Sequence, residues 1–534
     1  MNDPQTPSNK RLQIWLPLLF AAVLALGMYL GTRLQQIQQP GTRILLRNNS
    51  KVDQILQLIQ NRYVDTVDAA FITDQAIQDL LAQLDPYSAY IPAAHYEEAN
   101  QPLEGNFEGI GIEFYKLNDT ILVVSAISGG PSEQVGIRGG DKIIEVDGEK
   151  VAGINISNDE VIKKLRGKKG SKVKVSVKRN GQAELLGFTI TRDRIPIYSV
   201  DVAYLLNPTT GYIKINKFSA TTADEFREAF LKLKQQGALE ALVLDLRGNP
   251  GGYLDAAIRL ADEFLPAGKL ITYTQGRNQP RRDFKATGSG LYESGKLTIL
   301  IDEGSASASE IVSGAIQDHD RGTIIGRRSF GKGLVQEQFD LRDGSAVRLT
   351  VSRYYTPSGR SIQKPYERGG EREDDFLERL DRGELFSADS IRLADSTVFR
   401  TASGRIVYGG GGIIPDTFVP ADSNKFSDFT NELLNTGTLI QFSYQYADQR
   451  REELKKFADA AAFVAGFQVK ESDIQSLLRF AESEGLKPAN TSWRKDLPAL
   501  QLFLKANLGR QLYGNDAYYP TMHQRDSTLK KAVG

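Results

Sequence analysis

The sequence predicts a multidomain α/β fold: an α/β core with an inserted β-rich module, helical N- and C-terminal regions and one N-terminal transmembrane helix. Three observations predict this class. A chain of 534 residues is too long for one ordinary domain. Between residues 193 and 355, apolar strand-like runs alternate with helical stretches, which is typical of an α/β layer with a largely parallel or mixed sheet. Residues 101–192 instead contain short β-type runs separated by glycine turns.

The composition is that of a chain that folds and buries a core, with 40% hydrophobic and 25% charged residues. Lys+Arg and Asp+Glu both number 66, so the formal net charge is zero and no basic field points to nucleic acid. The sequence has no cysteine, which excludes disulfides, thiol catalysis and cysteine-based metal sites. It has only three histidines, so a histidine-rich metal site is not expected.

The N-terminal segment predicts a membrane anchor. Residues 12–32 carry no charge, and Lys10 and Arg11 precede them, as in a signal anchor. A helix of this length crosses the hydrocarbon core of a bilayer, roughly 30 Å thick. Arginines also follow the segment, so charge alone does not fix its orientation. Because a short tail is easier to retain than a long chain, we expect residues 1–11 in the cytoplasm and the remainder exported.

The later regions follow in order. Residues 33–100 are predicted to be helical, because apolar residues recur at three-to-four spacing. The β-rich module (101–192) contains one helical stretch, and the α/β core occupies 193–425. Its runs ALVLDL and LTILID are uninterrupted apolar segments, as expected for strands covered on both faces. The polar, glycine-rich part near 364–411 is predicted to be an inserted surface excursion, and 426–534 to be helical.

Three loops of the α/β core combine glycine with reactive side chains. They read DLRGNPGG (245–252), EGSASASEI (303–311) and RRSFGKGLVQ (327–336). In the first, Gly251 and Gly252 open a helix, where backbone N–H groups can approach a ligand. The second enters another helix. In the third, Lys332 stands between two glycines just before a strand.

These loops have two chemical interpretations. Gly326 to Lys332 spells G-x-x-x-x-G-K, but Gly333 replaces the Ser or Thr of a P-loop and a strand-like run follows, so nucleotide binding is the weaker alternative. The other is a serine nucleophile with a lysine base. Such a lysine must be neutral, which requires burial that lowers its pKa from about 10.4 to around 7–8.

Each residue also has an ordinary structural explanation. Ser307 with Glu310 forms the pattern S-x-x-E of a capping box. A lysine between glycines, such as Lys332, is typical of a solvated turn, and His319 is typical of a helix end. The residues taken one by one leave these explanations open.

The combination of loops resembles the carboxyl-terminal processing (tail-specific) serine protease family. The matching pieces are LDPYSAYI (84–91), FEGIGIEF (107–114), FTITRDRI (188–195), LDLRGNPGG (244–252), SASASEI (305–311), SFGKGLVQ (329–336) and YYTPSGRSIQ (354–363). They occur in the family's order, and the long segment before GIIPD resembles Bacteroidetes members. The resemblance implies an α/β serine endopeptidase core with a Ser–Lys dyad and an embedded PDZ domain.

The resemblance also implies roles for individual residues. Ser307, the serine before ASEI, is the expected nucleophile, with Ser305 and Ser309 as alternatives. Lys332 is the expected base, and Gln336 corresponds to the glutamine that orients the lysine amine.

The oxyanion hole is expected to use the Ala308 N–H and that of Gly251 or Gly252, between which the sequence does not decide. No metal or organic cofactor is implied. The expected partners are protein or peptide substrates with a free C-terminus, and nucleic acid is not expected.

The β-rich module resembles a PDZ domain. Its expected carboxylate-binding loop is Gly109, Ile110, Gly111 and Ile112, whose N–H groups would bind a substrate tail while the tail adds a strand to the sheet edge. Arg166 matches an arginine that links the PDZ domain to the active-site region in some relatives, although a solvated basic turn is equally compatible. Tail binding is expected to gate the activity.

The expected protein is therefore a single-pass inner-membrane enzyme with its catalytic region in the periplasm. A non-catalytic PDZ scaffold is the competing class, and the intact set of Ser307, Lys332 and Gln336 argues against it. For the C-terminal helices we expect assembly, for example as a homodimer, or capping of the substrate path.

Overall fold

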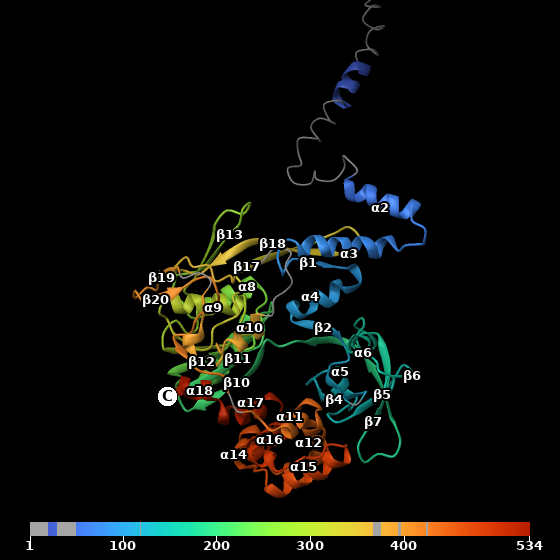
Figure 1. Ribbon diagram of the computed structural model, residues 1–534, viewed down its shortest axis with the longest axis vertical. Coiled ribbons are helices and arrows are strands. Elements are labelled where there is room, and N and C mark those ends of the chain that lie inside the picture. The colour runs from blue at the N-terminus through green and yellow to red at the C-terminus, as the bar shows by residue number, and fades with distance from the viewer. Residues whose placement is uncertain (1–19, 29–49, 118, 367–374, 394–396, 423–424) are drawn as a thin grey trace, which may run out of the picture. The chain divides into compact units, whose positions relative to one another are not determined.

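The computed structural model describes six stretches of the chain, which divides into two compact units, residues 1–77 and 78–534 (Figure 1). The described stretches are 20–28, 50–117, 119–366, 375–393, 397–422 and 425–534.

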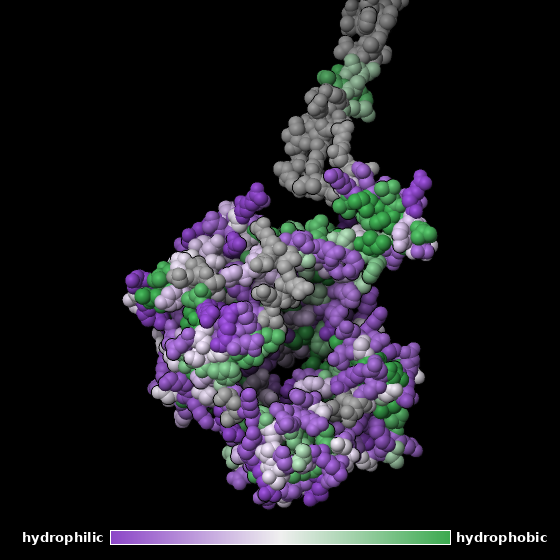
Figure 2. Space-filling model, viewed as in Figure 1, coloured by the Kyte–Doolittle hydropathy of each residue, from purple (hydrophilic) through white to green (hydrophobic). Residues whose placement is uncertain are grey.

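The described residues of the N-terminal unit are mainly helical, as the periodicity predicts. It contains α2 (Lys51–Arg62) and the first part of α3 (Ala69–Ala82). Ser50 caps α2: its hydroxyl accepts the Asp53 N–H, and the Asp53 carboxylate accepts the Ser50 N–H. None of the residues of α2 is buried, and Figure 2 shows apolar side chains exposed on this helix.

The predicted membrane span lies mostly outside the described residues. Of residues 12–32, only 20–28 are described, and they form an exposed helix. Across the described stretches, we find no helix that combines the length and the apolar character needed to cross a bilayer.

The second unit contains the predicted β-rich module. Its six-stranded antiparallel sheet has the order β3-β4-β5-β7-β8, with β6 beside β5. The elements are β3 (Ile112–Leu117), β4 (Thr120–Ala126), α5 (Pro131–Gln134), β5 (Lys142–Val146), β6 (Glu149–Lys150), α6 (Asn158–Leu165), β7 (Lys172–Lys178) and β8 (Leu186–Thr191). A short ribbon of β2 (Asn106–Gly109) and β9 (Asp193–Pro196) joins the module to the rest of the chain. Strand β3 pairs only with β4 among the described strands, so one of its edges is open.

The α/β core is built on a six-stranded sheet of order β10-β11-β12-β15-β16-β21, parallel except for β10 with β11. Its strands are β10 (Val200–Asn207), β11 (Thr210–Ile215), β12 (Ala241–Asp245), β15 (Lys296–Ile301), β16 (Thr323–Gly326) and β21 (Thr417–Phe418). Helices α7 (Thr222–Gln236), α8 (Leu254–Asp262) and α9 (Ala308–Asp318) follow strands of this sheet. The prediction of an α/β layer is confirmed.

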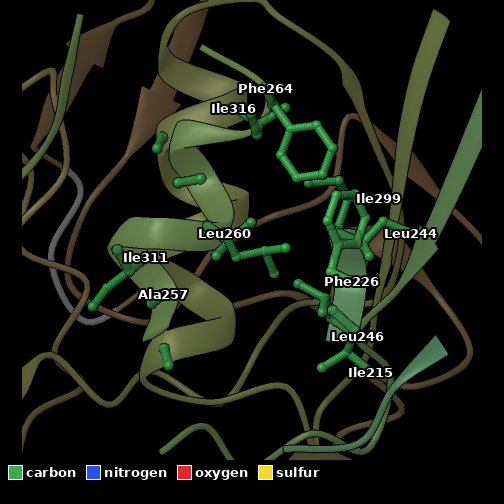
Figure 3. Close-up of a cluster of buried hydrophobic side chains, with 14 of the residues drawn as sticks. Ile215, Phe226, Leu244, Leu246, Ala257, Leu260, Phe264, Ile299, Ile311 and Ile316 are labelled. Atoms are coloured by element: carbon green, nitrogen blue, oxygen red, sulfur yellow. The ribbon is translucent and has the colours of Figure 1, made fainter. Parts of the chain in front are cut away.

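Alternation along the central strands explains their apolar runs. In β12, Leu242 and Leu244 pack against the helices, and Figure 3 shows Leu244 facing Leu260 of α8. Val243, between them, belongs instead to the cluster on the opposite face, which Leu529 near the C-terminal end covers. Since both faces are buried, a strand of continuous apolar residues is stable here.

A second sheet contains β17 and β18, and β17 begins within the loop segment 327–336. Its order is β1-β18-β13-β14, with β17 also paired to β18. The strands are β1 (Ala89–Ile91), β13 (Leu270–Gln275), β14 (Arg282–Lys285), β17 (Leu334–Asp340) and β18 (Ala346–Tyr355). The short helix α4 (Tyr96–Glu104) follows β1.

The inserted segment is not wholly on the surface. It contains α10 (Asp375–Asp381) and the hairpin of β19 (Val398–Arg400) and β20 (Ile406–Tyr408). Arg379 and Glu384, which the polar pattern assigns to a surface excursion, are each only 2% exposed because they pair with buried partners.

The C-terminal region is helical, as predicted. Its helices are α11 (Asp428–Asn435), α12 (Thr438–Gln449), α13 (Arg451–Leu454), α14 (Ala460–Gly466), α15 (Glu471–Ser483), α16 (Leu497–Tyr513), α17 (Asn515–Met522) and α18 (Ser527–Val533). Tyr444 of α12 reaches the β-rich module, where its hydroxyl donates to the Val124 carbonyl at 2.8 Å. Its ring packs against Gly139 and Gly140, at which an added Cβ would lie 3.2 and 3.3 Å from ring atoms.

Candidate active site

Ser307 stands at the turn between β15 and α9 in an unusual backbone conformation. Its φ of +54° and ψ of −109° are rare for a residue with a side chain. Such strain costs about 1–3 kcal/mol and persists only where the surroundings enforce it, often at a functional site. Ser307 is half-buried, whereas the alternatives Ser305 and Ser309 are fully buried. Their hydroxyls donate to the carbonyls of Leu246 and Asn249 respectively.

Glu310 joins the turn at Ser307 to the loop that contains Lys332. Its fully buried carboxylate accepts the N–H of Ser307 at 2.7 Å and that of Lys332 at 2.9 Å. It also accepts the Gly331 N–H at 2.7 Å and the Ser329 hydroxyl at 2.5 Å. Burial raises the pKa of Glu310 to about 7, against the effect of these four hydrogen bonds.

Tyr354 holds the same two residues from their carbonyl side. The Tyr354 hydroxyl lies 3.1 Å from the Ser307 carbonyl oxygen and 2.5 Å from that of Lys332, and it donates to both. Burial and the nearby Glu310 carboxylate raise the pKa of Tyr354 well above its usual value, so it stays a donor. The backbones of Ser307 and Lys332 are thus fixed relative to each other by one acceptor and one donor.

The Lys332 side chain is half-buried beside an aromatic ring. Its Nζ lies 4.6 Å from the centre of the Tyr87 ring. Asp85 fixes the turn that presents Tyr87 by accepting the N–H groups of Tyr87 and Ser88, both at 2.8 Å.

Gln336 lies two residues into β17. Its Nε2 atom is buried and has no hydrogen-bond partner among the residues that the structure describes. An unpaired buried donor is costly, so this amide group is available to a nearby acceptor.

The predicted catalytic residues share one cavity of about 580 Å³. The predicted residues that line it are Ser307, Lys332, Gln336, Ala308, Gly251 and Gly252. Helix α4 and strand β17 form further walls, through Tyr96, Asn100, Leu103, Glu104, Leu334, Val335 and Gln338. The structure therefore brings together all the residues for which the resemblance implies chemistry.

The first loop and the start of α9 each present one free N–H donor at this cavity. The Gly251 N–H donates to the Asn249 side chain at 2.9 Å. Within the described part of the chain, the N–H groups of Gly252 and Ala308 have no acceptor. Gly251 also cannot carry a side chain, because its φ is +96° and a Cβ would lie 2.7 Å from the Ala306 carbonyl oxygen.

The C-terminal region anchors the DLRG part of this loop through ion pairs. Arg247 forms ion pairs with Asp245 at 2.6 Å and with Asp526 at 2.7 Å. Beside them, a ring nitrogen of His523 lies 2.5 Å from the Tyr204 hydroxyl. Burial lowers the pKa of His523 to about 4, so the imidazole is neutral.

The predicted carboxylate-binding loop lies at a second cavity of about 400 Å³ between β3 and α6. Ile110, Gly111 and Ile112 line it, whereas Gly109 ends the neighbouring strand β2. The Ile110 carbonyl is already engaged by Ser132, through its N–H at 3.0 Å and its hydroxyl at 2.7 Å. The open edge of β3 borders the same groove.

Arg166 connects this groove to the helix beside the catalytic cavity. It lines the groove at the end of α6, stacks on the Phe107 ring at 4.9 Å, and donates to the Gln101 side chain of α4 at 3.3 Å. Arg510 of α16 lines the groove as well and pairs with Glu113 at 3.2 Å. The predicted link has a physical path, and the C-terminal contribution is one that the sequence did not predict.

Sequence reasoning also missed Tyr87 and Tyr354. Both lie in quoted motifs, LDPYSAYI and YYTPSGRSIQ, so their position in these motifs was the available signal. The P-loop alternative is wrong, because Lys332 is followed by β17 and not by a helix. His319 caps the end of α9, and its ring bonds the Leu270 carbonyl, in keeping with a helix-end residue.

Comparisons with known proteins agree with these features. The family model of peptidase family S41 matches residues 209–369, and that of the PDZ domain matches 109–190. The N-terminal domain of the activating protease CtpB matches 27–94, and a family of unknown function matches 429–514.

The chain is also similar to individual proteins. A carboxy-terminal-processing protease of Bartonella bacilliformis is 35% identical over 350 residues, which cover 65% of this chain and 80% of the relative. The carboxy-terminal processing protease CtpB of Bacillus subtilis is 33% identical over 63% of this chain and 72% of its own length. Among solved structures, the photosystem II D1 C-terminal processing protease is 30% identical over 59% of this chain and 83% of its own, with a TM-score of 0.35.

Proposed function

The chain belongs to peptidase family S41, the carboxy-terminal processing serine proteases, and we propose that Ser307 and Lys332 form its catalytic pair. It is a serine endopeptidase that cleaves proteins near their C-termini, with a PDZ domain suited to binding the substrate tail. One observation carries the assignment of the pair: Glu310 and Tyr354 hold the backbones of both residues at the wall of one cavity.

The reaction is an acyl transfer. Neutral Lys332 takes the proton of the Ser307 hydroxyl, and the oxygen attacks the scissile carbonyl. The N–H groups of Ala308 and Gly252 stabilise the oxyanion, and Gln336 orients the lysine amine. Lys332 then returns the proton to the leaving amine and activates the water that hydrolyses the acyl-enzyme.

Cleavage of an unfolded protein substrate by the purified full chain tests the pair. We expect Ser307→Ala and Lys332→Ala each to abolish cleavage, because they remove the nucleophile and the base. The matched controls Ser305→Ala and Ser309→Ala make the same substitution in the same loop. Because they leave the proposed nucleophile in place, they should retain cleavage. Equal cleavage by Ser307→Ala and the wild type would contradict the assignment.

The PDZ domain gates this activity. A substrate tail binds at Ile110 to Ile112 and adds a strand to β3, and Arg166 transmits the occupancy through α4. In Arg166→Ala, a tail peptide should still bind but no longer stimulate cleavage. Stimulation equal to that of the wild type would exclude this route.

The location of the enzyme and its assembly are further parts of the proposal. Residues 1–11 remain in the cytoplasm, 12–32 anchor the chain in the inner membrane, and the catalytic region lies in the periplasm. The uncharged run after Lys10 and Arg11 supports this. Release of the protein from membranes by alkaline carbonate would contradict the membrane anchor. An alkaline phosphatase fusion at residue 50 that stays inactive would contradict the periplasmic location.

A homodimer is supported by the exposed apolar face of α2. Val52, Ile55 and Leu58 are 53%, 56% and 60% exposed, and three apolar side chains at this spacing form one stripe. We expect Ile55→Glu to shift the light-scattering mass of the detergent-solubilised chain from two copies to one. A single-copy mass in the wild type would refute the dimer.

A further inference from the structure

The loop that contains Lys332 (327–336) contacts a buried arginine of the inserted segment on the side away from the cavity. Arg379 of α10 is 2% exposed, and its guanidinium donates to two consecutive carbonyls of the loop. The bond to the Arg328 carbonyl is 2.6 Å long, and the bond to the Ser329 carbonyl is 3.2 Å long. Lys332 follows three residues later.

Glu384 completes this contact. Its carboxylate, also 2% exposed, accepts two hydrogen bonds of 2.8 Å from Arg328 and one of 2.9 Å from Arg379. Paired charges of this kind are tolerated in a protein interior only when their geometry is satisfied, as it is here. A solvated surface excursion has no need of such a network, whereas a support for the loop does.

Ser329 contacts both Arg379 of the inserted segment and Glu310 of the candidate active site. Its carbonyl accepts Arg379 from the insertion, and its hydroxyl donates to Glu310, which also holds the Lys332 N–H. The Ser329 N–H and hydroxyl further bond Ile413, where the insertion returns to the core. A displacement of Arg379 is therefore passed through one residue to the contacts of Lys332.

We propose that Arg379 and Glu384 are positioning residues for Lys332, so that the inserted segment sets where the catalytic amine lies. The inference rests on the proposed role of Lys332 as the base. Neither residue touches the cavity, so both act through the loop backbone.

Arg379→Met tests this without leaving a buried charge alone, because Arg328 and Glu384 still form a one-to-one pair. Arg382→Met is the matched control: it removes the arginine that directly follows α10, whose side chain is 37% exposed and pairs with the half-exposed Glu378. Arg379→Lys keeps the charge but places its donors on a single nitrogen, and it serves as the conservative variant.

The full chain is assayed for kcat and KM on an unfolded substrate, for binding of a tail peptide, and for its melting temperature. A misplaced catalytic group loses on the order of 10²-fold in rate. We expect Arg379→Met to lower kcat by about 10- to 100-fold with KM and peptide affinity within about two-fold of wild type. Arg379→Lys should recover part of this loss, and Arg382→Met should match the wild type.

Two results would overturn the inference. One is a folded Arg379→Met whose kcat equals that of Arg382→Met. The other is a parallel fall of kcat, peptide binding and melting temperature in both Arg379 variants, which indicates a general structural role. Lys332→Ala, measured alongside, separates this from the proposed function: if it remains active, the base assignment itself is wrong.

Discussion

Replacing Glu310 with glutamine tests how the structure fixes the proposed catalytic pair, Ser307 and Lys332. Glutamine has nearly the same size, but one carboxylate oxygen becomes an NH₂ group. In either orientation of the amide, two of the four donors that Glu310 accepts face another donor. Each buried donor left unsatisfied costs about 1–3 kcal/mol, so we expect a loss of about 2–6 kcal/mol at this junction.

The loss should appear in kcat before it appears in binding. Because the junction holds Ser307 and Lys332 together, we expect kcat on an unfolded substrate to fall by about 10²-fold or more, with tail-peptide affinity unchanged. Glu303→Gln is the control, since Glu303 is in the same loop but pairs with Arg327 outside the cavity. A folded Glu310→Gln enzyme with kcat within about three-fold of wild type would refute the reasoning.

The pKa of Glu310 adds a second readout. It is raised from 4.5 to about 7, so the folded protein retains a proton that the unfolded chain releases between these pH values. Stability should therefore fall as pH rises through this window, by up to about 3 kcal/mol. Urea unfolding of the wild type and Glu310→Gln at pH 4.5 and 7 measures the difference, and identical pH slopes would contradict it.

The remaining predictions concern the supports around the site. Gly251→Ala should lower kcat at least about 10²-fold, because its Cβ collides with the turn that contains Ser307. Gly248 is also at positive φ but has open space around it, so Gly248→Ala should keep its activity. Similar activities of the two variants would exclude the collision. The pKa of His523 is lowered from 6.5 to about 4, so its contribution to stability should be lost as pH falls through that window, and a thermal-melting series with His523→Gln should show a smaller loss. Tyr444→Phe should reduce the free energy of unfolding by about 1 kcal/mol and raise hydrogen exchange near Val124; no change in either measurement would mean that this contact contributes nothing.

The sequence located the candidate site best where the site depends on short stretches of chain. Ser307 at a helix start and Lys332 between glycines are local patterns, and the structure brings both to one cavity. The capping-box prediction for Glu310 holds for the Ser307 N–H. Its other three donors lie 19 to 22 residues away, and no local pattern reveals such a contact.

The inserted segment shows a second limit. Its charged residues predict exposure, because a lone charge is costly to bury. Arg379 and Glu384 are buried because each supplies the other's counter-charge, and a polarity pattern does not distinguish a charge that faces water from one that faces a partner. For the same reason Arg510, 344 residues beyond Arg166 in the chain, was not predicted to line the same groove.

The fit of Tyr444 against Gly139 and Gly140 limits how this protein can be recombined with its relatives. At Gly139 a methyl group would also lie 2.6 Å from the Val124 carbonyl oxygen, and Gly140 has a φ of +90°. A chimera that receives a foreign PDZ domain without this glycine pair would push α12 outward. Grafts should therefore exchange the module together with the helices that follow residue 426, or leave both in place.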